Sequence, residues 1–448
     1  MLVSPTPTPK REWILGCFAS GDSFEGFRFR GIDLSGIDFS GGHFAGALFE
    51  DCNLSGANLT SSDLKGANFN RADLTAAILN GAQMTDALLT NADLTKASLR
   101  KADLTRADFR GSRLEEADID GAVLERADFE GAHFDKGFFL GRDLSKVRFK
   151  GADFSGVVFS GRDLSGCEFD TCDFSGANLS GTTLRKTRFQ GCKLSGANLS
   201  HSKQEGTSFL NSDIRGADFA EAQILHADFL RANPEGTKFT RTRFELCPLN
   251  ELPLRQAVID GTIFRTCTFG PIDLSGLDLS GIDFMNSKMA GVNLRGANLE
   301  GANLTRCNLP AADFTMTKMA GCIAVNANFS GAKMHGADLT GSTLGHSFFD
   351  KTHMEAANFT SCRMERIICR GGMAPGAVFR NAVLTQSDLS NSDLSGADFQ
   401  GAELTETNLH GVNREGADFS GSTVEKARAT DPELLAAETW QPPPLLAE

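Results

Sequence analysis

The sequence predicts an all-β chain that winds into a parallel β-helix, and three observations support this prediction. Every fifth residue from Phe24 to Val424 is a central position, and 75 of these 81 positions hold Leu, Phe, Ile, Met or Val. Phenylalanine also recurs every twenty residues, and the chain has 35 Phe but no Tyr. Helices and strands repeat every ~3.6 and ~2 residues, so a five-residue period requires a chain that turns a corner every five residues.

Four such corners close one coil of twenty residues. The column of central positions from Phe29 to Leu409 holds 13 Phe in 20 places, and the column from Phe39 to Phe419 holds 9. Two residues before each centre the chain prefers a small residue, with Ala in 35 of 81 places. Only a small side chain fits beside a large central one in a close-packed axis. The pattern therefore predicts one continuous axial core.

The run ANLTSSDLKGANFNRADL, residues 57–74, resembles the pentapeptide-repeat family, whose consensus is A(D/N)LXX. The resemblance extends over residues 22–424. It implies a right-handed quadrilateral parallel β-helix, a pentapeptide-repeat solenoid of about twenty coils at the spacing of β-strands.

Three segments are expected along the chain: a tail and cap over 1–21, the β-helix over 22–424, and a cap helix with a Pro-rich tail over 425–448. Apolar residues predict that the first segment plugs the axial core; they are Trp13, Ile14, Leu15 and Phe18. The run DPELLAAETW begins with a helix start signal. That helix could cover the last coil or pair with its copy in a homodimer.

The roughest internal passage is 233–256, where Pro234, Pro248 and Pro253 each lack a backbone N–H donor. We expect an irregular coil or a bend there. Because the five-residue register continues through it, a locally distorted rod is preferred to two separate domains.

The positions of Cys and His argue against a metal-binding or catalytic site. Ten of the eleven cysteines fall on the small-residue phase and Cys369 falls on the central phase, so all are expected to point inward as small apolar side chains. The eight histidines fall on outward phases without metal-ligand spacing. Asp at the corners is expected to satisfy turn amides. We therefore predict no catalytic, cofactor-binding or metal site, no cofactor and no enzymatic activity.

Charge and hydropathy limit the partners. The net charge is −13, but residues 100–150 carry 11 basic and 11 acidic residues, whereas 351–448 carry 8 and 14. The sequence has no basic stripe of the kind that binds nucleic acid, so direct nucleic-acid binding is not expected. The sequence has no run of about 18 apolar residues, so no membrane span is expected. The amino terminus lacks a signal pattern, so a bacterial cytoplasmic location is expected unless a specialised system exports the chain.

Two apolar ladders are candidate protein-binding surfaces. Arg142 and Arg162 occupy the small inward phase, so each must reach solvent or pair with an acid such as Asp143 or Asp163. Phe138 and Val158 stand nearby on a phase that usually holds Asp or Asn. Aromatic and Arg side chains are typical of interface hot spots. The candidate protein-binding residues are Phe138, Leu140, Arg142, Val158 and Arg162, with a weaker ladder at Leu210 and Leu230 near Leu225; tolerated drift in a scaffold is the alternative.

We therefore predict a non-enzymatic scaffold or adaptor that binds one or more proteins of unknown identity. Phrases such as GRDLSG resemble pentapeptide-repeat components that accompany bacterial type VI secretion clusters, or secreted effectors. The family resemblance also supplies an alternative, since some members protect DNA gyrase by mimicking DNA with an acidic rod. The mixed charge of this chain favours the scaffold.

Overall fold

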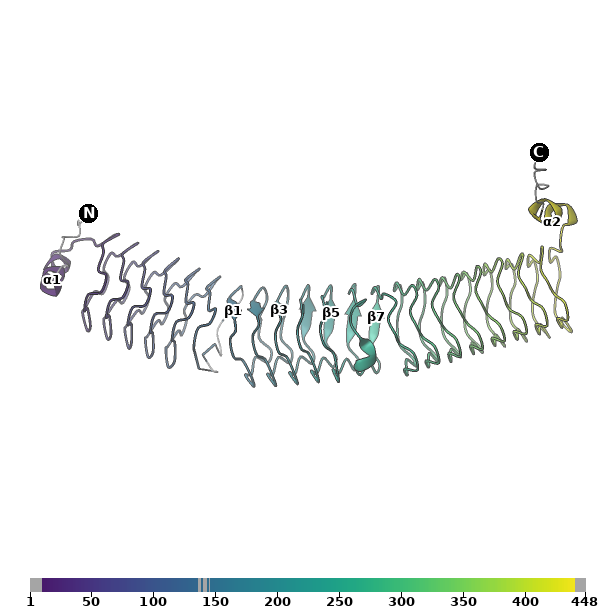
Figure 1. Cartoon of the computed structure of the whole chain (residues 1–448), viewed down its shortest axis with the longest axis horizontal. Helices are drawn as coiled ribbons and strands as arrows, with labels where there is room; N and C mark the ends of the chain where they lie inside the picture. The colour runs from purple at the N-terminus through teal and green to yellow at the C-terminus, as the bar shows by residue number, and fades with distance from the viewer. Residues whose placement is uncertain (1–9, 136–137, 140–142, 145, 440–448) are drawn as a thin grey trace, which may run out of the picture. The chain divides into compact units, whose positions relative to one another are not determined.

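The computed structural model describes residues 10–135, 138–139, 143–144 and 146–439 (Figure 1). The chain divides into two compact units, one made of residues up to Ala222 together with Ala227–Thr237, and the other of Gln223–His226 together with Lys238 onward. The elements in chain order are α1 (Arg11–Ala19), β1 (Arg148–Lys150), β2 (Glu168–Asp170), β3 (Arg188–Gln190), β4 (Lys203–Glu205), β5 (Gln223–Leu225), β6 (Arg243–Glu245), the 3-10 helix η1 (Leu254–Gln256), β7 (Ile263–Arg265) and α2 (Pro432–Thr439).

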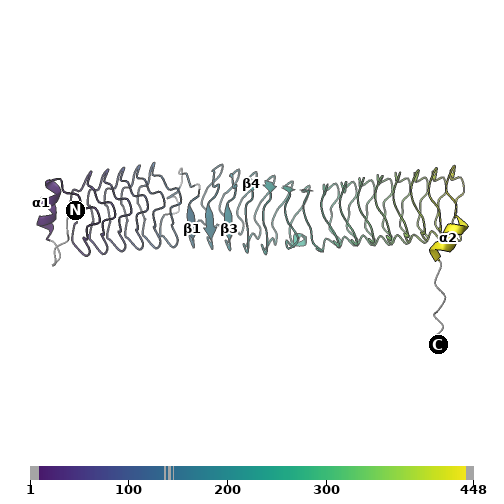
Figure 2. The ribbon, with the colours of Figure 1, turned by 90° about the horizontal axis from the view of Figure 1, so that it is seen from above.

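The first unit is a stack of coils joined by parallel bridges between residues twenty positions apart (Figure 2). The bridges begin with Arg28 and Leu48, and Leu48 in turn pairs with Asn68. In β1, β2 and β3 the same register lengthens into three-residue strands, in which Phe149 is opposite Phe169 and Phe169 is opposite Phe189. Each coil thus hydrogen-bonds to the next, and the unit is a parallel β-solenoid.

The second unit repeats this construction. Strands β5, β6 and β7 pair in parallel, with Ile224 opposite Phe244 and Phe244 opposite Phe264. Bridges with the same twenty-residue offset continue to Asn408 and Arg428. Regular strands are short because each side of a coil holds only a few extended residues before the next corner.

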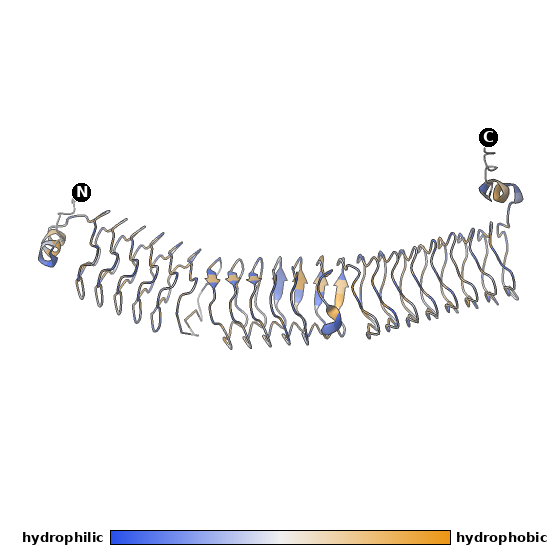
Figure 3. Cartoon of the chain, in the orientation of Figure 1, coloured by the Kyte–Doolittle hydropathy of each residue, from blue (hydrophilic) through white to orange (hydrophobic). Residues whose placement is uncertain are grey.

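The core of each unit is its axis, as the five-residue period predicts. Central side chains such as Phe29, Phe49 and Phe69 are 0% exposed. Their rings stack in parallel, with centroids 4.5 Å and 4.9 Å apart. Ala47 and Ala67, two residues before Phe49 and Phe69, are equally buried. Hydrophobic and hydrophilic colours therefore alternate at short intervals along the coils in Figure 3.

Helix α1 lies at the amino-terminal end of the first unit. Ile14 is fully buried, and the Phe18 ring contacts those of Phe24 and Phe39 at centroid distances of 6.5 Å and 5.0 Å. Arg11 donates from Nη2 to the carbonyl oxygen of Ser35 at 2.7 Å. Trp13 stacks on Phe27 but keeps an exposed edge. The helix thus covers apolar rings of the first coils.

Two predicted side-chain directions are wrong near the ends of the repeat. Cys17 was expected to point into a coil, but it belongs to α1 and is partly exposed. His410 was expected to face outward, but it is buried beside the start of α2. In both cases a helix, not a coil, determines what surrounds the side chain. The other ten cysteines are buried.

The passage over 233–256 contains one departure from the coil, the 3-10 helix η1 that begins at Leu254 directly after Pro253. Asn233 and Pro248 still form parallel bridges, to Asp213 and Thr268. The division of the chain into two units falls within 222–238, and the predicted bend over 233–256 stays a prediction.

Aspartates that directly precede the turns hold them. Oδ1 of Asp33 accepts the Ser35 backbone N–H at 3.0 Å, and Oδ1 of Asp273 accepts that of Ser275 at 3.0 Å. The pKa of Asp33 is lowered by this backbone hydrogen bond. The pKa of Asp418 is lowered to about 2 by hydrogen bonds from the Ser420 hydroxyl, the Gln400 amide and the Ser420 backbone. The turns thus favour ionised carboxylates.

We expect acid to destabilise the solenoid. A carboxyl group whose folded pKa lies below its unfolded value of about 3.9 contributes stability above that pH and loses it as the pH falls through the folded pKa. Thermal melts should thus be constant from pH 7 to about 5 and fall steeply below about pH 4. Replacing Asp273 by Asn keeps the acceptor oxygen and should remove only that residue's share. A melting temperature unchanged down to about pH 2 would contradict these roles.

Candidate interaction surface

The predicted apolar ladder is only partly present at the surface. The prediction that Phe138 faces solvent is wrong, because its side chain is only 6% exposed. The chain leaves the regular coil after Phe134, and the Phe138 ring packs on Phe134 and Phe139 at centroid distances of 5.9 Å and 4.8 Å. Leu140 and Arg142 lie outside the described residues. Phe138 is therefore a core residue of an irregular coil.

The remaining predicted residues keep some exposure. Val158 is 53% exposed, and Arg162 is exposed although it stands on the small inward phase. The backbone of Arg162 stays in the coil, since its N–H donates to the Phe159 oxygen at 3.0 Å. Leu210 and Leu230 are half-buried. Whether these residues bind a protein stays a prediction.

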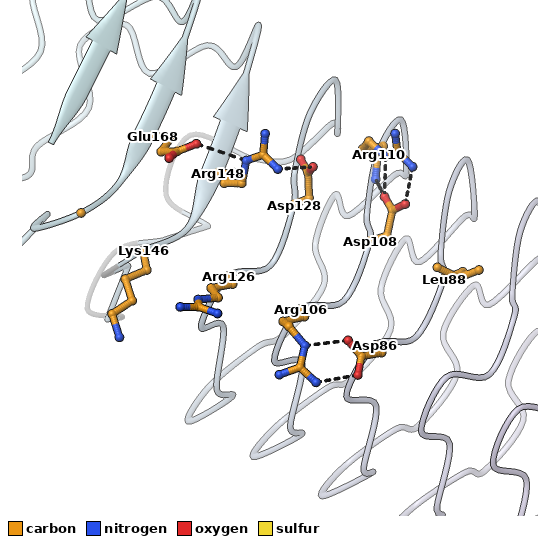
Figure 4. A pocket seen from close by; sticks show the side chains of 11 residues that line it. Asp86, Leu88, Arg106, Asp108, Arg110, Arg126, Asp128, Lys146, Arg148 and Glu168 are labelled. Carbon is orange, nitrogen blue, oxygen red and sulfur yellow. Dashed lines mark hydrogen bonds and ion pairs between the residues drawn. The ribbon is translucent and has the colours of Figure 1, made fainter. Parts of the chain in front are cut away.

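A different part of the first unit forms a charged groove of about 900 Å³ (Figure 4). One wall is a column of corner residues, each twenty positions after the last: Asp86, Arg106, Arg126 and Lys146. All four have φ between 55° and 64°. This left-handed conformation is what a corner of the coil requires, and glycine occupies it at most other corners. Here charged residues take that place, so three cations stand on successive coils.

The second wall is mixed in charge. It consists of Leu88, Asp108, Asp128, Arg148 and Glu168, again one residue per coil. Arg148 lies between two acids, with 3.8 Å from Nη1 to Asp128 Oδ2 and 3.3 Å from Nε to Glu168 Oε2. Arg110 pairs with Asp108 at 2.6 Å. The acids of this wall are thus largely neutralised by neighbours.

The cations of the first wall differ in their partners. Arg106 donates two hydrogen bonds to Asp86, and these bonds lower the pKa of Asp86. Lys146 Nζ lies 2.8 Å from Glu125 Oε1 and lowers the pKa of that carboxyl. Within the described ranges no acid forms an ion pair with Arg126, which is exposed between these two cations. Arg126 is therefore the least neutralised charge of the groove.

This arrangement is suited to binding. The groove lines up charges in fixed register, but it offers no nucleophile oriented by a base. Among the residues that the structure describes, no group of three or more His, Cys, Asp or Glu side chains could hold a metal ion. None of the helices in the described part of the chain has the length and apolarity needed to cross a membrane.

Family models identify the repeat. A model described as pentapeptide repeats (8 copies) matches overlapping segments over 23–161, 272–345 and 369–425, which is more than half of the chain. A second model, described as a pentapeptide repeat region, matches 162–239. The chain belongs to the pentapeptide-repeat family.

Solved structures include other pentapeptide-repeat proteins. One from the thylakoid lumen of Arabidopsis thaliana is 37% identical over 23% of this chain and 68% of its own, with a TM-score of 0.19. HetL of Nostoc sp. strain PCC 7120, described as involved in heterocyst differentiation regulation, is 22% identical over 61% and 87%, with a TM-score of 0.15. QnrB1, described as a plasmid-mediated fluoroquinolone resistance protein, is 16% identical over 65% and 94%, with a TM-score of 0.11. A comparison with curated proteins found no match.

The groove of this pentapeptide-repeat protein was missed in the sequence, although a signal for it exists. Arg106, Arg126 and Lys146 are twenty residues apart and stand where glycine is common. Reading each outward column for charge would have brought them together. Residues 100–150 are neutral in total, which hides the column of three cations on one wall.

The carboxy-terminal end of the repeat keeps apolar side chains at the surface. A cavity there is lined by residues of the last coils that include Leu409, Phe419 and Val424. Val424 is 50% exposed although it stands on the central phase. Helix α2 is held to one side, where the Asp431 N–H donates to His410 Nδ1 at 3.2 Å and His410 Nε2 lies 3.4 Å from Glu438 Oε2. The axial core therefore ends with an accessible apolar face.

Proposed function

We propose that this pentapeptide-repeat protein is a non-enzymatic interaction scaffold whose charged groove binds an acidic segment of another protein. The observation that carries the proposal is the column Arg106, Arg126 and Lys146, which stands on hydrogen-bonded coils. Bridges hold neighbouring coils at about 4.8 Å, so the three cations keep their spacing without a partner. A partner therefore meets a preorganised pattern, which reduces the cost of ordering side chains on binding.

Electrostatic complementarity indicates the kind of partner. Arg126 has no ion pair within the described residues, so an incoming carboxylate gains an interaction there without breaking an existing one. Arg106 and Lys146 would either leave their ion pairs with Asp86 and Glu125 for a carboxylate of the partner or contact both carboxylates at once. Complementary charge mainly raises the association rate and the specificity, and its effect weakens with salt.

We expect reversal of the groove charge to abolish binding. The double variant Arg126→Glu with Lys146→Glu should lose at least about tenfold in affinity for an acidic partner, because two attractions become repulsions. Affinity capture with the wild type, followed by quantitative mass spectrometry, identifies the proteins retained at low salt and released at high salt. Binding of those proteins is then measured for each variant.

The double variant Arg306→Glu with Arg366→Glu is the matched control, since both residues occupy equivalent corners of the second unit with φ of 56° and 58°. It should leave binding unchanged. Equal loss in both variants would show that net charge alone acts, and unchanged binding in both would contradict the groove. The exposed residues Val158 and Arg162 remain a proposed second contact area, together with Leu210 and Leu230.

A second candidate function is modulation of DNA gyrase. The observation that favours it is a coil carrying acids on successive sides: Asp388, Asp393, Asp398 and Glu403. Acids outnumber bases by 14 to 8 over 351–448. A supercoiling assay with and without a fluoroquinolone separates the candidates, because a scaffold leaves gyrase unaffected while a mimic changes its activity or its drug sensitivity.

The finer fold is also proposed. Bridges twenty residues apart and corners five residues apart support four sides per coil, and the register from Phe24 to Val424 supports about twenty coils. A right-handed quadrilateral winding and a type VI secretion setting are supported by resemblance alone, and a bacterial cytoplasmic location stays a prediction.

The open apolar end supports a homodimer through the carboxy-terminal end. Val424 is half-exposed on a surface that also contains Phe419, and pairing with a second copy would bury both. Sedimentation should then show a dimer that Val424→Asp converts to monomer. A wild-type monomer at high concentration would contradict this pairing.

A further inference from the structure

Two pairs of cysteines lie one coil apart in the axial core, a feature that the proposed function does not use. Cys172 and Cys192 belong to the first unit, and Cys247 and Cys267 to the second. No other two of the eleven cysteines are twenty residues apart. The residues that follow them pair as parallel bridges, Asp173 with Lys193 and Pro248 with Thr268. Each pair is therefore stacked in register.

The spacing of the coils suits a disulfide. Neighbouring strands lie about 4.7–4.9 Å apart. A disulfide needs a Cα–Cα separation of about 4.4–6.8 Å, so neither backbone would have to move far. All four thiols are buried, with exposed fractions of 1% or less.

The paired thiols are oriented differently from several of the single ones. Single cysteines donate S–H to a carbonyl in the previous coil at short range, as Cys307 does to Phe284 at 2.9 Å and Cys362 to Leu339 at 2.9 Å. Across that coil the paired sulfurs make longer contacts, 3.5 Å from Cys192 to Phe169 O and 3.6 Å from Cys247 to Ile224 O. Each paired sulfur also contacts the carbonyl oxygen two residues before it, at 3.5 Å for Cys172, 3.7 Å for Cys192, 3.3 Å for Cys247 and 3.5 Å for Cys267. Within each pair the two side chains lie close enough for one to shift the pKa of the other.

Each pair has a serine as its neighbour in the following coil. The Ser212 hydroxyl accepts the Cys192 backbone N–H at 3.1 Å, and the Ser287 hydroxyl accepts that of Cys267 at 3.0 Å. Each serine stands twenty residues after the second cysteine of its pair. The same Cys–Cys–Ser column thus occurs once in each unit.

We propose that each pair is an oxidation site, at which a low-molecular-weight disulfide such as oxidised glutathione converts two stacked thiols into a disulfide between adjacent coils. One cysteine thiolate attacks the glutathione disulfide, forming a mixed disulfide and releasing one glutathione thiolate. The second cysteine thiolate attacks the mixed disulfide and releases the other. Two cysteine thiols are oxidised, one glutathione disulfide is reduced, and the two cysteine protons end on the two glutathione thiols.

The buried setting determines the rate. The partner thiol, together with burial, raises the pKa of Cys192 and of Cys267, whereas the interaction with Cys192 lowers the pKa of Cys172. Because all four thiols are buried, glutathione reaches them only when neighbouring coils open, so oxidation should be slow. It should be faster at higher pH, because the thiolate is the attacking species. Each bond would close a loop, and the loop from Cys247 to Cys267 contains η1. A closed loop restricts the unfolded chain, so the oxidised protein should melt at a higher temperature.

The test oxidises the folded full-length chain with oxidised glutathione at about pH 8, near the pKa of a free thiol. Remaining thiols are then blocked with N-ethylmaleimide in denaturant, and peptides are mapped by mass spectrometry. We expect links between Cys172 and Cys192 and between Cys247 and Cys267, a loss of about 4 Da from four hydrogens, and a melting temperature that dithiothreitol returns to its original value. Full blocking of all eleven thiols would overturn the proposal, as would scrambled links that include Cys307 or Cys362.

Alanine variants assign each link to its pair of cysteines. Ala is the commonest residue on this phase, so Cys172→Ala and Cys247→Ala should fold, and each should lose only its own link. Cys307→Ala is the control and should keep both. Oxidation repeated during slow refolding from urea gives the reagent access, and links scattered among all cysteines there would also overturn the proposal.

Discussion

Replacing Phe169 by Ala should lower the free energy of unfolding by about 3–5 kcal/mol, since a buried aromatic side chain is lost and a cavity remains. Phe169 is 0% exposed. Its ring stacks between Phe149 and Phe189 at centroid distances of 5.3 Å and 5.2 Å. Phe174 meets it edge-on at 4.9 Å. The coils above and below are held by bridges, so they cannot close over the cavity.

The matched control is Phe348→Ala. Phe348 is the same residue type but stands on an outward phase and is 41% exposed. It should cost about 1 kcal/mol or less, because its ring lies on the outer surface of a coil, where its removal leaves no cavity in the axial core. Urea unfolding followed by circular dichroism measures both variants. Similar costs at the two positions would contradict an axial core.

Arginine should be tolerated at position 162 but not at position 182. Thr182 stands one coil after Arg162 on the same small inward column, is 0% exposed, and donates its hydroxyl to the Leu179 oxygen at 2.6 Å. Thr182→Arg would bury an unpaired guanidinium and should destabilise the chain by at least about 3 kcal/mol. Arg162→Ala should change stability by about 0.5 kcal/mol or less, because the Arg162 side chain is exposed.

Thr182→Ala distinguishes charge from the loss of the threonine. It removes one hydroxyl and should cost only about 1 kcal/mol. Thermal melts of the three variants give the comparison. If Thr182→Arg melted like the wild type, the inward column would have to be open at that coil as well, and the assignment of the small phase to the core would be wrong.

The sequence predicts the core well because a five-residue period leaves little freedom. Phe29, Phe169 and Phe244 are buried for the same reason, and their neighbours twenty residues away follow from one count. Each coil repeats the same local chemistry, so a prediction made for one coil transfers to the next.

The failures lie where something other than the repeat decides the structure. Phe138 keeps the register in sequence, but its coil is irregular and the side chain turns inward. His410 and Cys17 are positioned by helices at the ends. The free charge of the groove depends on which cation lacks an ion pair, and that is decided by the contacts of side chains on neighbouring coils. Part of this difference can be read from the sequence in steps of twenty, since Asp86 precedes Arg106 whereas Arg106 precedes Arg126; that Arg106 pairs with Asp86 is a matter of side-chain geometry.

The most direct test of the parallel solenoid is a set of distances within the second unit. Spin-labelled residues introduced genetically at 298 and at 358, 378, 398 or 418 avoid the native cysteines. If each twenty residues advance the chain by one strand spacing, pulsed electron paramagnetic resonance should give Cα separations near ~14, ~19, ~24 and ~29 Å. Distances that do not increase linearly with the number of coils would contradict the account.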